Sequence, residues 1–169
     1  MTIHRIAEQH DLPAIVAIYN STIASREVTA DTEEVSVASR QEWFDAHTPD
    51  KRPLWVLEMD QGQGKQIVGW MSFSNFYGRP AYSGTAELSI YLHPDARGKG
   101  LGTYCLKLAE AHAPQVLVHT LLGFIFGHNA ASLGLFKKMG YQQWAELPKV
   151  ANLDGIERDL IILGKRISA

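Results

Sequence analysis

A glycine-rich segment between a strand pattern and a helix pattern constrains the fold of this chain more than any other feature. Residues 86–92 alternate as a strand does, residues 97–103 read Arg-Gly-Lys-Gly-Leu-Gly-Thr, and residues 101–113 have helical spacing of apolar side chains. The first amides of a helix lack intrahelical acceptors and lie at the positive end of its dipole. The segment is therefore predicted to bind a phosphate group.

Three phosphate-binding motifs can be compared with this segment. A Walker A loop requires Ser or Thr directly after Gly-Lys, but Gly100 follows Lys99. A dinucleotide-binding loop requires a third glycine where Thr103 stands. The pattern that fits is Arg-x-x-Gly-x-Gly, formed by Arg97, Gly100 and Gly102. A pattern this short also occurs in ordinary strand-to-helix turns.

The composition of the chain argues against several classes of protein. Its 169 residues, of which 46% are hydrophobic, suit a single domain covering residues 1–169. The formal net charge of −2 and the scattered basic residues argue against a nucleic-acid partner. No apolar stretch approaches ~18 residues, and the first residues lack the apolar core of a signal peptide. We therefore expect no membrane partner and a cytoplasmic location.

The single cysteine and the seven histidines form no pattern of a redox or metal site. Cys105 cannot form an intrachain disulfide, and its helical spacing with Leu101 and Leu108 favours a buried side chain over a nucleophile. The histidines show neither His-x3-His nor His-x-x-Glu-His spacing. We therefore expect no metal.

Strand and helix patterns alternate along the whole chain. Strands are expected at residues 3–7, 54–59, 67–76, 85–93, from 116 or 118 to 126 with a break at Gly123, 141–147 and 156–163. Helices are expected at residues 12–23, 39–48, 101–113 and 130–139. Local signals for the helix ends are Asp11 and Asn129 as N-caps, Ser39 with Glu42 as a capping box, and Gly140 as a C-cap.

Two motifs resemble those of the GNAT superfamily of N-acetyltransferases. The first is Arg97-x-x-Gly100-x-Gly102, the loop that holds the pyrophosphate of acetyl-CoA in that superfamily. The second is Asn-Ala-Ala-Ser at residues 129–132, followed by Leu-Phe-Lys-Lys-Met-Gly-Tyr at residues 135–141. The resemblance implies the GNAT fold, an α/β (α+β) domain whose mixed, mostly antiparallel sheet of about seven strands is flanked by four helices.

A narrower resemblance covers nearly the full chain. Ile-Tyr-Asn at residues 18–20, Trp-Phe at 43–44, Arg-Pro-Ala-Tyr at 79–82 and the strand Thr-x-Glu-x-Ser-x-Tyr at 85–91 look like the phosphinothricin and methionine sulfoximine acetyltransferases. This implies a homodimer that moves acetyl from acetyl-CoA to the α-amine of a small amino acid such as phosphinothricin, methionine sulfoximine or methionine sulfone. The alternatives are a protein N-terminal or polyamine acetyltransferase and a non-catalytic acyl-CoA-binding sensor.

The resemblance implies two groups of residues that bind acetyl-CoA. Backbone groups of the splayed strand would pair with pantetheine, the glycine-rich loop would hold the pyrophosphate, and the second motif would bind the pantetheine arm. The residues are Ile90, Tyr91, Leu92, Arg97, Gly98, Lys99, Gly100, Leu101, Gly102, Thr103, Asn129 and Ser132. Arg97 as a solvated loop cation and Asn129 as a helix cap alone are the alternatives.

Glu87 is the candidate general base on the strand before this loop. It shares one face of the strand with Ser89 and Tyr91. A carboxylate with a pKa of about 4.3 needs burial, or a water relay, to take a proton from an ammonium group. A structural salt bridge is the alternative. Phe136 stands where many members of the superfamily have a proton-donating tyrosine, so water protonates the thiolate or CoA leaves as the thiolate.

The residues just before this strand are candidates for binding the amino acid. A guanidinium group and a hydroxyl at Arg79 and Tyr82 suit a carboxylate and a second polar head. The same segment contains Pro80 and Ala81, and Lys149 precedes the last strand. Arg79 and Lys149 could instead be exposed loop residues.

Overall fold

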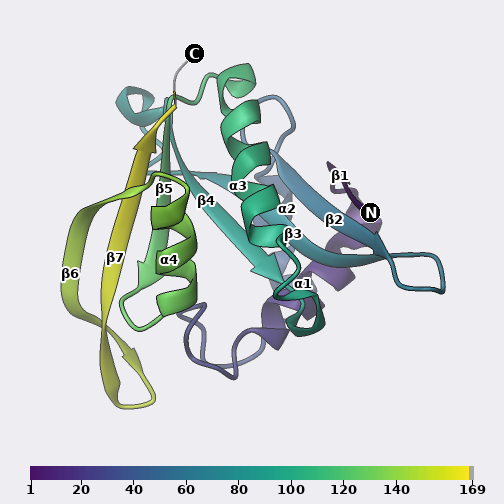
Figure 1. The fold of residues 1–169 in the computed structure, drawn as a ribbon, viewed down its shortest axis with the longest axis horizontal. Helices are drawn as coiled ribbons and strands as arrows, with labels where there is room; N and C mark the ends of the chain where they lie inside the picture. The colour runs from purple at the N-terminus through teal and green to yellow at the C-terminus, as the bar shows by residue number, and fades with distance from the viewer. Residues whose placement is uncertain (168–169) are drawn as a thin grey trace.

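One mixed sheet organises the part of the chain that the computed structural model describes, residues 1–167. Seven strands of this part follow the order β1-β2-β3-β4-β5-β7-β6 (Figure 1). Every neighbouring pair is antiparallel except β4 and β5, which are parallel. The strands are β1 Thr2–Ile6, β2 Leu54–Asp60, β3 Lys65–Asn75, β4 Thr85–Leu92, β5 Thr120–Phe126, β6 Gln142–Leu153 and β7 Ile156–Arg166. The predicted mixed, mostly antiparallel sheet is confirmed.

The α-helices pack on the two faces of the sheet, as predicted for four helices. Within residues 1–167 they are α1 Leu12–Ser21, α2 Gln41–Asp45, α3 Leu101–His112 and α4 Ala130–Lys138. The cluster on the α1 face includes Ile15, Tyr19 and Trp70. The larger cluster, on the α3 and α4 face, includes Leu88, Leu106 and Phe136. None of the helices in residues 1–167 is long and apolar enough to cross a membrane.

Strand β4 separates these two clusters, because its side chains alternate between them as the sequence predicts. Leu88 is buried in the α3 cluster. Tyr91 lies on the other face and stacks on Trp70, with 4.6 Å between ring centroids. The Trp70 indole in turn donates to the Ile15 carbonyl oxygen at 3.1 Å. The face of β4 that carries Tyr91 is thus held against helix α1 through Trp70.

The sheet opens between β4 and β5. Their register contains three pairs: Thr85 with Thr120, Ala86 with Leu121, and Glu87 with Leu122. Beyond these pairs the two strands diverge (Figure 1). The amide of His93 donates to the Val68 carbonyl oxygen of β3. Because the backbone groups of successive residues in a strand point to opposite neighbours, those of Ile90 and Leu92 point away from β3, toward the open side. This is the splayed strand that the resemblance implied.

Two predicted helix caps are wrong. Helix α2 follows the 3-10 turn Ala38–Arg40, and the Ser39 hydroxyl donates to the Ser36 carbonyl oxygen at 2.7 Å instead of capping α2. Asp11 makes no side-chain cap to α1. Its carboxylate accepts from the Glu8 amide at 2.7 Å and from Arg5, because a 3-10 turn precedes the helix there too.

Several predicted strand limits also differ from the structure. Strand β5 begins at Thr120, because a 3-10 turn over Ala113–Val116, with Pro114 in its first turn, ends at the C-cap Leu117 with φ of +59°. Gly123 does not break β5. Its missing side chain makes room for Phe136, whose Cε2 would lie 2.6 Å from an added Cβ. Strands β6 and β7 run on to Leu153 and Arg166, since two bulges in β6 let the pairing continue.

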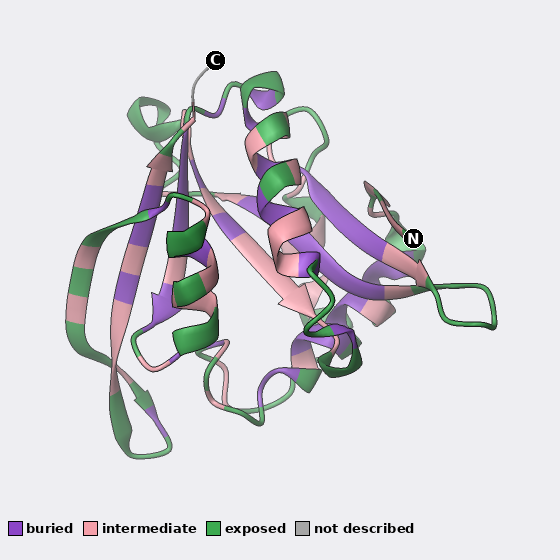
Figure 2. Ribbon diagram, viewed as in Figure 1, coloured by how far each residue is buried: buried purple, intermediate pink, exposed green. Residues whose placement is uncertain are grey.

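Buried residues line the central strands, and β6 forms the exposed edge (Figure 2). Such a strand contributes little to the core. The opening between β4 and β5, by contrast, lies among the buried central strands.

Candidate active site

A cavity of about 420 Å³ occupies this opening. Its walls come from β4, β5, the N-terminal ends of α3 and α4, and the loop after α1. It brings together these sequence-predicted residues: Glu87, Ile90, Tyr91, Leu92, Arg97, Gly98, Gly100, Leu101, Gly102, Thr103, Asn129 and Ser132. Lys99 belongs to the same loop but does not line the cavity.

The glycine-rich loop has the backbone geometry of an anion site. Gly98 and Gly100 have φ of +74° and +78°, a region that favours glycine. Gly100 is the N-cap of α3, and the first helical hydrogen bond runs from the Tyr104 amide to the Gly100 carbonyl oxygen at 3.1 Å. The amides of residues 101–103 precede that bond and are free for an anion. A Cβ at either glycine would meet no atom within 4 Å, so the space before the loop is open.

Gly102 has a different role from the one expected of a loop glycine. A Cβ there would lie 2.5 Å from Cδ2 of Leu135 on α4. The missing side chain therefore lets α3 and α4 approach closely. Gly102 serves helix packing first, whereas Gly98 and Gly100 serve the loop.

Glu87 lies at the point where β4 and β5 separate. Its carboxylate lines the cavity and is half-buried. Burial raises the pKa of the Glu87 carboxyl above its ordinary value. The hydrogen bonds and ion pairs of residues 1–167 include none to this carboxylate, so it is not held in a structural salt bridge there. A raised pKa in a cleft marks Glu87 as a candidate proton acceptor.

Asn129 is confirmed as the N-cap of α4 and makes a second contact. Its Oδ1 accepts from the Ser132 amide at 3.2 Å. Its Nδ2 donates to the carbonyl oxygen of Glu27 at 3.2 Å. Each polar atom keeps one further hydrogen-bonding position, so the amide can also bind a ligand in the cavity.

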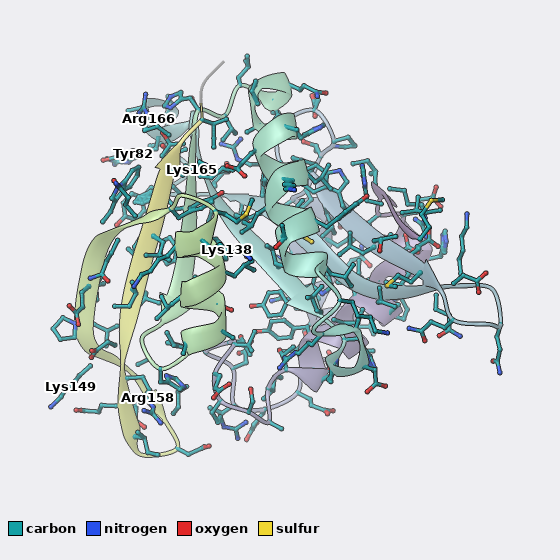
Figure 3. All side chains as sticks on the ribbon, in the orientation of Figure 1. Tyr82, Lys138, Lys149, Arg158, Lys165 and Arg166 are labelled. Atoms are coloured by element: carbon teal, nitrogen blue, oxygen red, sulfur yellow. The ribbon has the colours of Figure 1, made fainter. Side chains whose placement is uncertain are left out.

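The predicted amino-acid-binding residues lie outside the cavity of the single chain. Arg79, Pro80, Ala81 and Tyr82 are exposed, with Pro80–Tyr82 forming a 3-10 turn before β4. Lys149 is exposed on β6, at the outer edge of the sheet (Figure 3). The structure does not bring these five residues to Glu87.

Aromatic contacts connect this 3-10 turn to the cavity. The rings of Tyr82 and Phe76 have centroids 5.7 Å apart, and those of Phe76 and Phe124 lie 6.4 Å apart. Phe124 lines the cavity. A displacement of the Tyr82 ring can therefore be transmitted to the cavity through the rings of Phe76 and Phe124.

Other cavity residues were not predicted from the sequence. The loop after α1 contributes Thr22, Glu27 and Val28, and β5 contributes Phe124. Leu135 and Phe136, which belong to the second motif of the sequence analysis, line the cavity as well. The loop residues carry no local signal, because they reach the cleft only when α1 packs on the sheet. Phe136 is 6% exposed and packs edge-on against Tyr141, with 5.0 Å between centroids.

The family model described as "Acetyltransferase (GNAT) family" matches residues 15–141. These residues include the glycine-rich loop, Glu87 and the Asn129 cap. The chain belongs to the GNAT family of acetyltransferases.

Individual relatives narrow the comparison. The chain is 52% identical over 164 residues to "Putative phosphinothricin acetyltransferase YwnH" of Bacillus subtilis (strain 168), covering 97% of this chain and 98% of that protein. It is 32% identical over 153 residues to an L-methionine sulfoximine/L-methionine sulfone acetyltransferase of Pseudomonas paraeruginosa, covering 90% and 87%.

A solved structure gives the corresponding comparison for the fold. It is described as yncA, "a putative acetyltransferase from Salmonella typhimurium with its cofactor acetyl-CoA". It superimposes with a TM-score of 0.88 at 27% identity, covering 99% of this chain and 94% of that one.

The chain is thus an acetyltransferase of the phosphinothricin and methionine sulfoximine type by similarity.

Proposed function

We propose that this enzyme transfers acetyl from acetyl-CoA to the α-amine of a small amino acid such as phosphinothricin, methionine sulfoximine or methionine sulfone. The observation that carries the proposal is the position of Glu87, a carboxylate without an ion-pair partner in residues 1–167, beside the opening between β4 and β5. The names of the relatives support the choice of acceptor. The acetyl-CoA in the Salmonella structure supports the choice of donor.

The cavity supplies what acetyl-CoA requires for binding. The free amides of residues 101–103 and the guanidinium group of Arg97 suit a pyrophosphate. The outward backbone groups of Ile90 and Leu92 suit the amide-containing pantetheine arm, which would pair as an extra strand. One of these N–H groups can stabilise the oxyanion that forms on the thioester.

Glu87 removes the proton that blocks attack by an ammonium acceptor. The neutral amine then attacks the thioester carbon, the carbon–sulfur bond breaks, and the nitrogen releases its second proton to solvent water, so that an amide and the CoA thiolate form. A pKa raised by burial makes Glu87 a better proton acceptor than an ordinary carboxylate, either directly or through a water molecule. Phe136 cannot protonate the leaving thiolate. The thiolate leaves without an acid at this position, since thiols have a pKa near 8.5.

We further propose that the enzyme is a homodimer and that Arg79, Tyr82 and Lys149 bind the amino acid. The exposed rings of Tyr77 and Tyr82, which are 70% and 44% accessible, support an interface close to Arg79. Sedimentation velocity tests the dimer. A species of 18.8 kDa at micromolar concentration would contradict it.

Thiol release from acetyl-CoA tests the proposed reaction. The panel contains phosphinothricin, methionine sulfoximine, methionine sulfone, spermidine and an alanine-initiated peptide. We expect release with the amino acids. Preference for spermidine or the peptide would overturn the choice of acceptor, and tight CoA binding with no release for any acceptor would favour a sensor.

A further inference from the structure

Arg26 has an unusual backbone conformation close to the cavity. Its φ is +56°, in the left-handed region that a residue with a side chain rarely adopts. The next two residues, Glu27 and Val28, line the cavity. Such a conformation persists only where surrounding contacts impose it, and it is typical of functional sites. The contacts that impose it here are therefore informative.

Three contacts from the far end of the sequence hold the loop of residues 23–28. Nε2 of His128 lies 2.8 Å from the Arg26 carbonyl oxygen, so this nitrogen carries the hydrogen and donates it. Nδ2 of Asn129 donates to the Glu27 carbonyl oxygen at 3.2 Å. Nε of Arg26 donates to Oδ2 of Asp154 at 2.5 Å, in the turn between β6 and β7.

These contacts cross the opening in the sheet. The 23–28 loop extends from α1, which packs on β3 and β4 (Figure 1). His128 and Asn129 follow β5, on the other side of the opening. Because the paired register of β4 and β5 ends at Glu87 and Leu122, the loop joins the two sides where the strands are apart.

We propose that Arg26, His128 and Asp154 are positioning residues that hold the 23–28 loop over the acceptor end of the cleft. The inference rests on the proposed function, because it assigns the loop to the amino acid and the glycine-rich loop to acetyl-CoA. The assignment follows from the two faces of the sheet. The 23–28 loop continues α1 on the face that carries Glu87 and Tyr91, whereas the glycine-rich loop begins α3 on the opposite face.

The three contacts have unequal weight. The Arg26–Asp154 pair is largely accessible, with side chains 30% and 58% exposed, so solvent weakens it. The hydrogen bond from His128 is part-buried, so water competes with it less. Loss of His128 should therefore loosen the loop more than loss of Asp154. Asn129 is left unchanged in the test, because it also caps α4 and lines the cavity.

The test uses variants that disturb the loop from a distance. His128→Ala removes the donor, and His128→Gln keeps a side-chain N–H. Asp154→Gly removes the carboxylate while accepting the φ of +56° at that position. Glu157→Ala, an exposed position on the same hairpin, is the matched control.

Hydrogen exchange of the apo protein is the first readout. The Arg26 amide donates to the Ile23 carbonyl oxygen at 3.0 Å, so its exchange reports the loop directly. We expect exchange at residues 23–28 to become at least fivefold faster in His128→Ala and about twofold faster in Asp154→Gly. His128→Gln and Glu157→Ala should stay near the wild type. Unchanged exchange in His128→Ala would overturn the positioning role, whatever the enzyme acetylates.

Steady-state kinetics is the second readout. In His128→Ala we expect the KM for methionine sulfoximine to rise at least fivefold and the KM for acetyl-CoA to change less than twofold. Equal increases in both constants would show a general structural effect and overturn the proposal. If the wild type acetylates no amino acid, the proposed function fails by itself, while the exchange experiment still decides whether these residues hold the loop.

Discussion

Glu87 and Leu122 form the last residue pair that joins β4 to β5. The proposed general base is thus placed at the point where the sheet opens. Up to Glu87, the backbone of β4 pairs with β5. Beyond Glu87, the backbone groups of β4 that face the opening are available for a ligand. This arrangement puts the proposed proton acceptor next to the place where the thioester is expected to bind.

Replacing Glu87 with Gln should lower kcat/KM for the amino acid about 10²–10⁴-fold, the usual contribution of general-base catalysis. In the wild type, kcat/KM should fall at low pH as the carboxylate becomes protonated. Burial raises the pKa of Glu87, so this limb should lie above the range of an ordinary carboxylate. The pH profile of Glu87→Gln should lack the limb. Retention of more than a tenth of the activity would rule out Glu87 as the base.

The same substitution should stabilise the fold at neutral pH. The folded chain binds the Glu87 proton more tightly than the unfolded chain, because burial raises this pKa. The contribution of Glu87 to the free energy of unfolding is therefore most favourable below the ordinary pKa of 4.5 and becomes less favourable as the pH rises through the raised value. At pH 7, Glu87→Gln should raise Tm, because the neutral amide carries no cost of burying a charge. Calorimetry at pH 7 and pH 4 checks this, since the gain should shrink at pH 4.

Phe136→Tyr should change turnover less than tenfold. The structure shows the Phe136 ring buried against Gly123 and Tyr141, and the thiolate can leave without an acid. Measurement of kcat with saturating acetyl-CoA and amino acid gives the answer. A gain of more than tenfold would mean that a missing proton donor limits the reaction.

Gly102→Ala should destabilise the protein by about 1–3 kcal/mol, the usual cost of overpacking. The new Cβ would lie 2.5 Å from Cδ2 of Leu135, so this side chain must leave its position against α3. Gly134→Ala is the matched control, because a Cβ there meets no atom within 4 Å. Urea unfolding of Gly102→Ala, Gly134→Ala, Leu135→Ala and the double variant with Gly102→Ala and Leu135→Ala checks the cause. If the double variant is as unstable as the sum of the single variants, contact with Leu135 is not the reason.

Arg79→Ala should raise the KM for the amino acid far more than the KM for acetyl-CoA. Arg79 is exposed and lies outside the cavity of one chain, so a role in the acceptor site requires a rearrangement or a second chain. Initial rates with each substrate varied in turn measure the two constants. Equal effects on both would argue against Arg79 as a substrate ligand.

Local patterns in the sequence predict much of this architecture. The alternation of β4 places Leu88 and Tyr91 on opposite faces, and Asn129 and Gly140 mark the ends of α4 as expected. These features depend on residues close together in the chain. For the same reason, a glycine-rich turn with free amides at the start of α3 could be predicted from seven residues.

Features that depend on tertiary packing could not be predicted in this way. Nothing near Glu27 or Val28 in the sequence indicates that they reach the cleft, because their loop is held by distant residues, His128 at the Arg26 carbonyl oxygen and Asn129 at the Glu27 carbonyl oxygen. The role of Gly102 depends on Leu135 in another helix. The predicted capping box at Ser39 was wrong because a 3-10 turn, which the pattern does not distinguish, comes before α2.

The strand order also determines when the cleft can exist during synthesis. Strand β5 forms one wall of the opening, and it is paired over three positions with β4 but over seven with β7. Strand β7 is the last strand made, yet it lies between β5 and β6. Since chains fold from the N-terminus as they emerge, the half of the sheet that carries α1 and β4 can form early. The wall opposite Glu87 has its main partner only when residue 166 has left the ribosome.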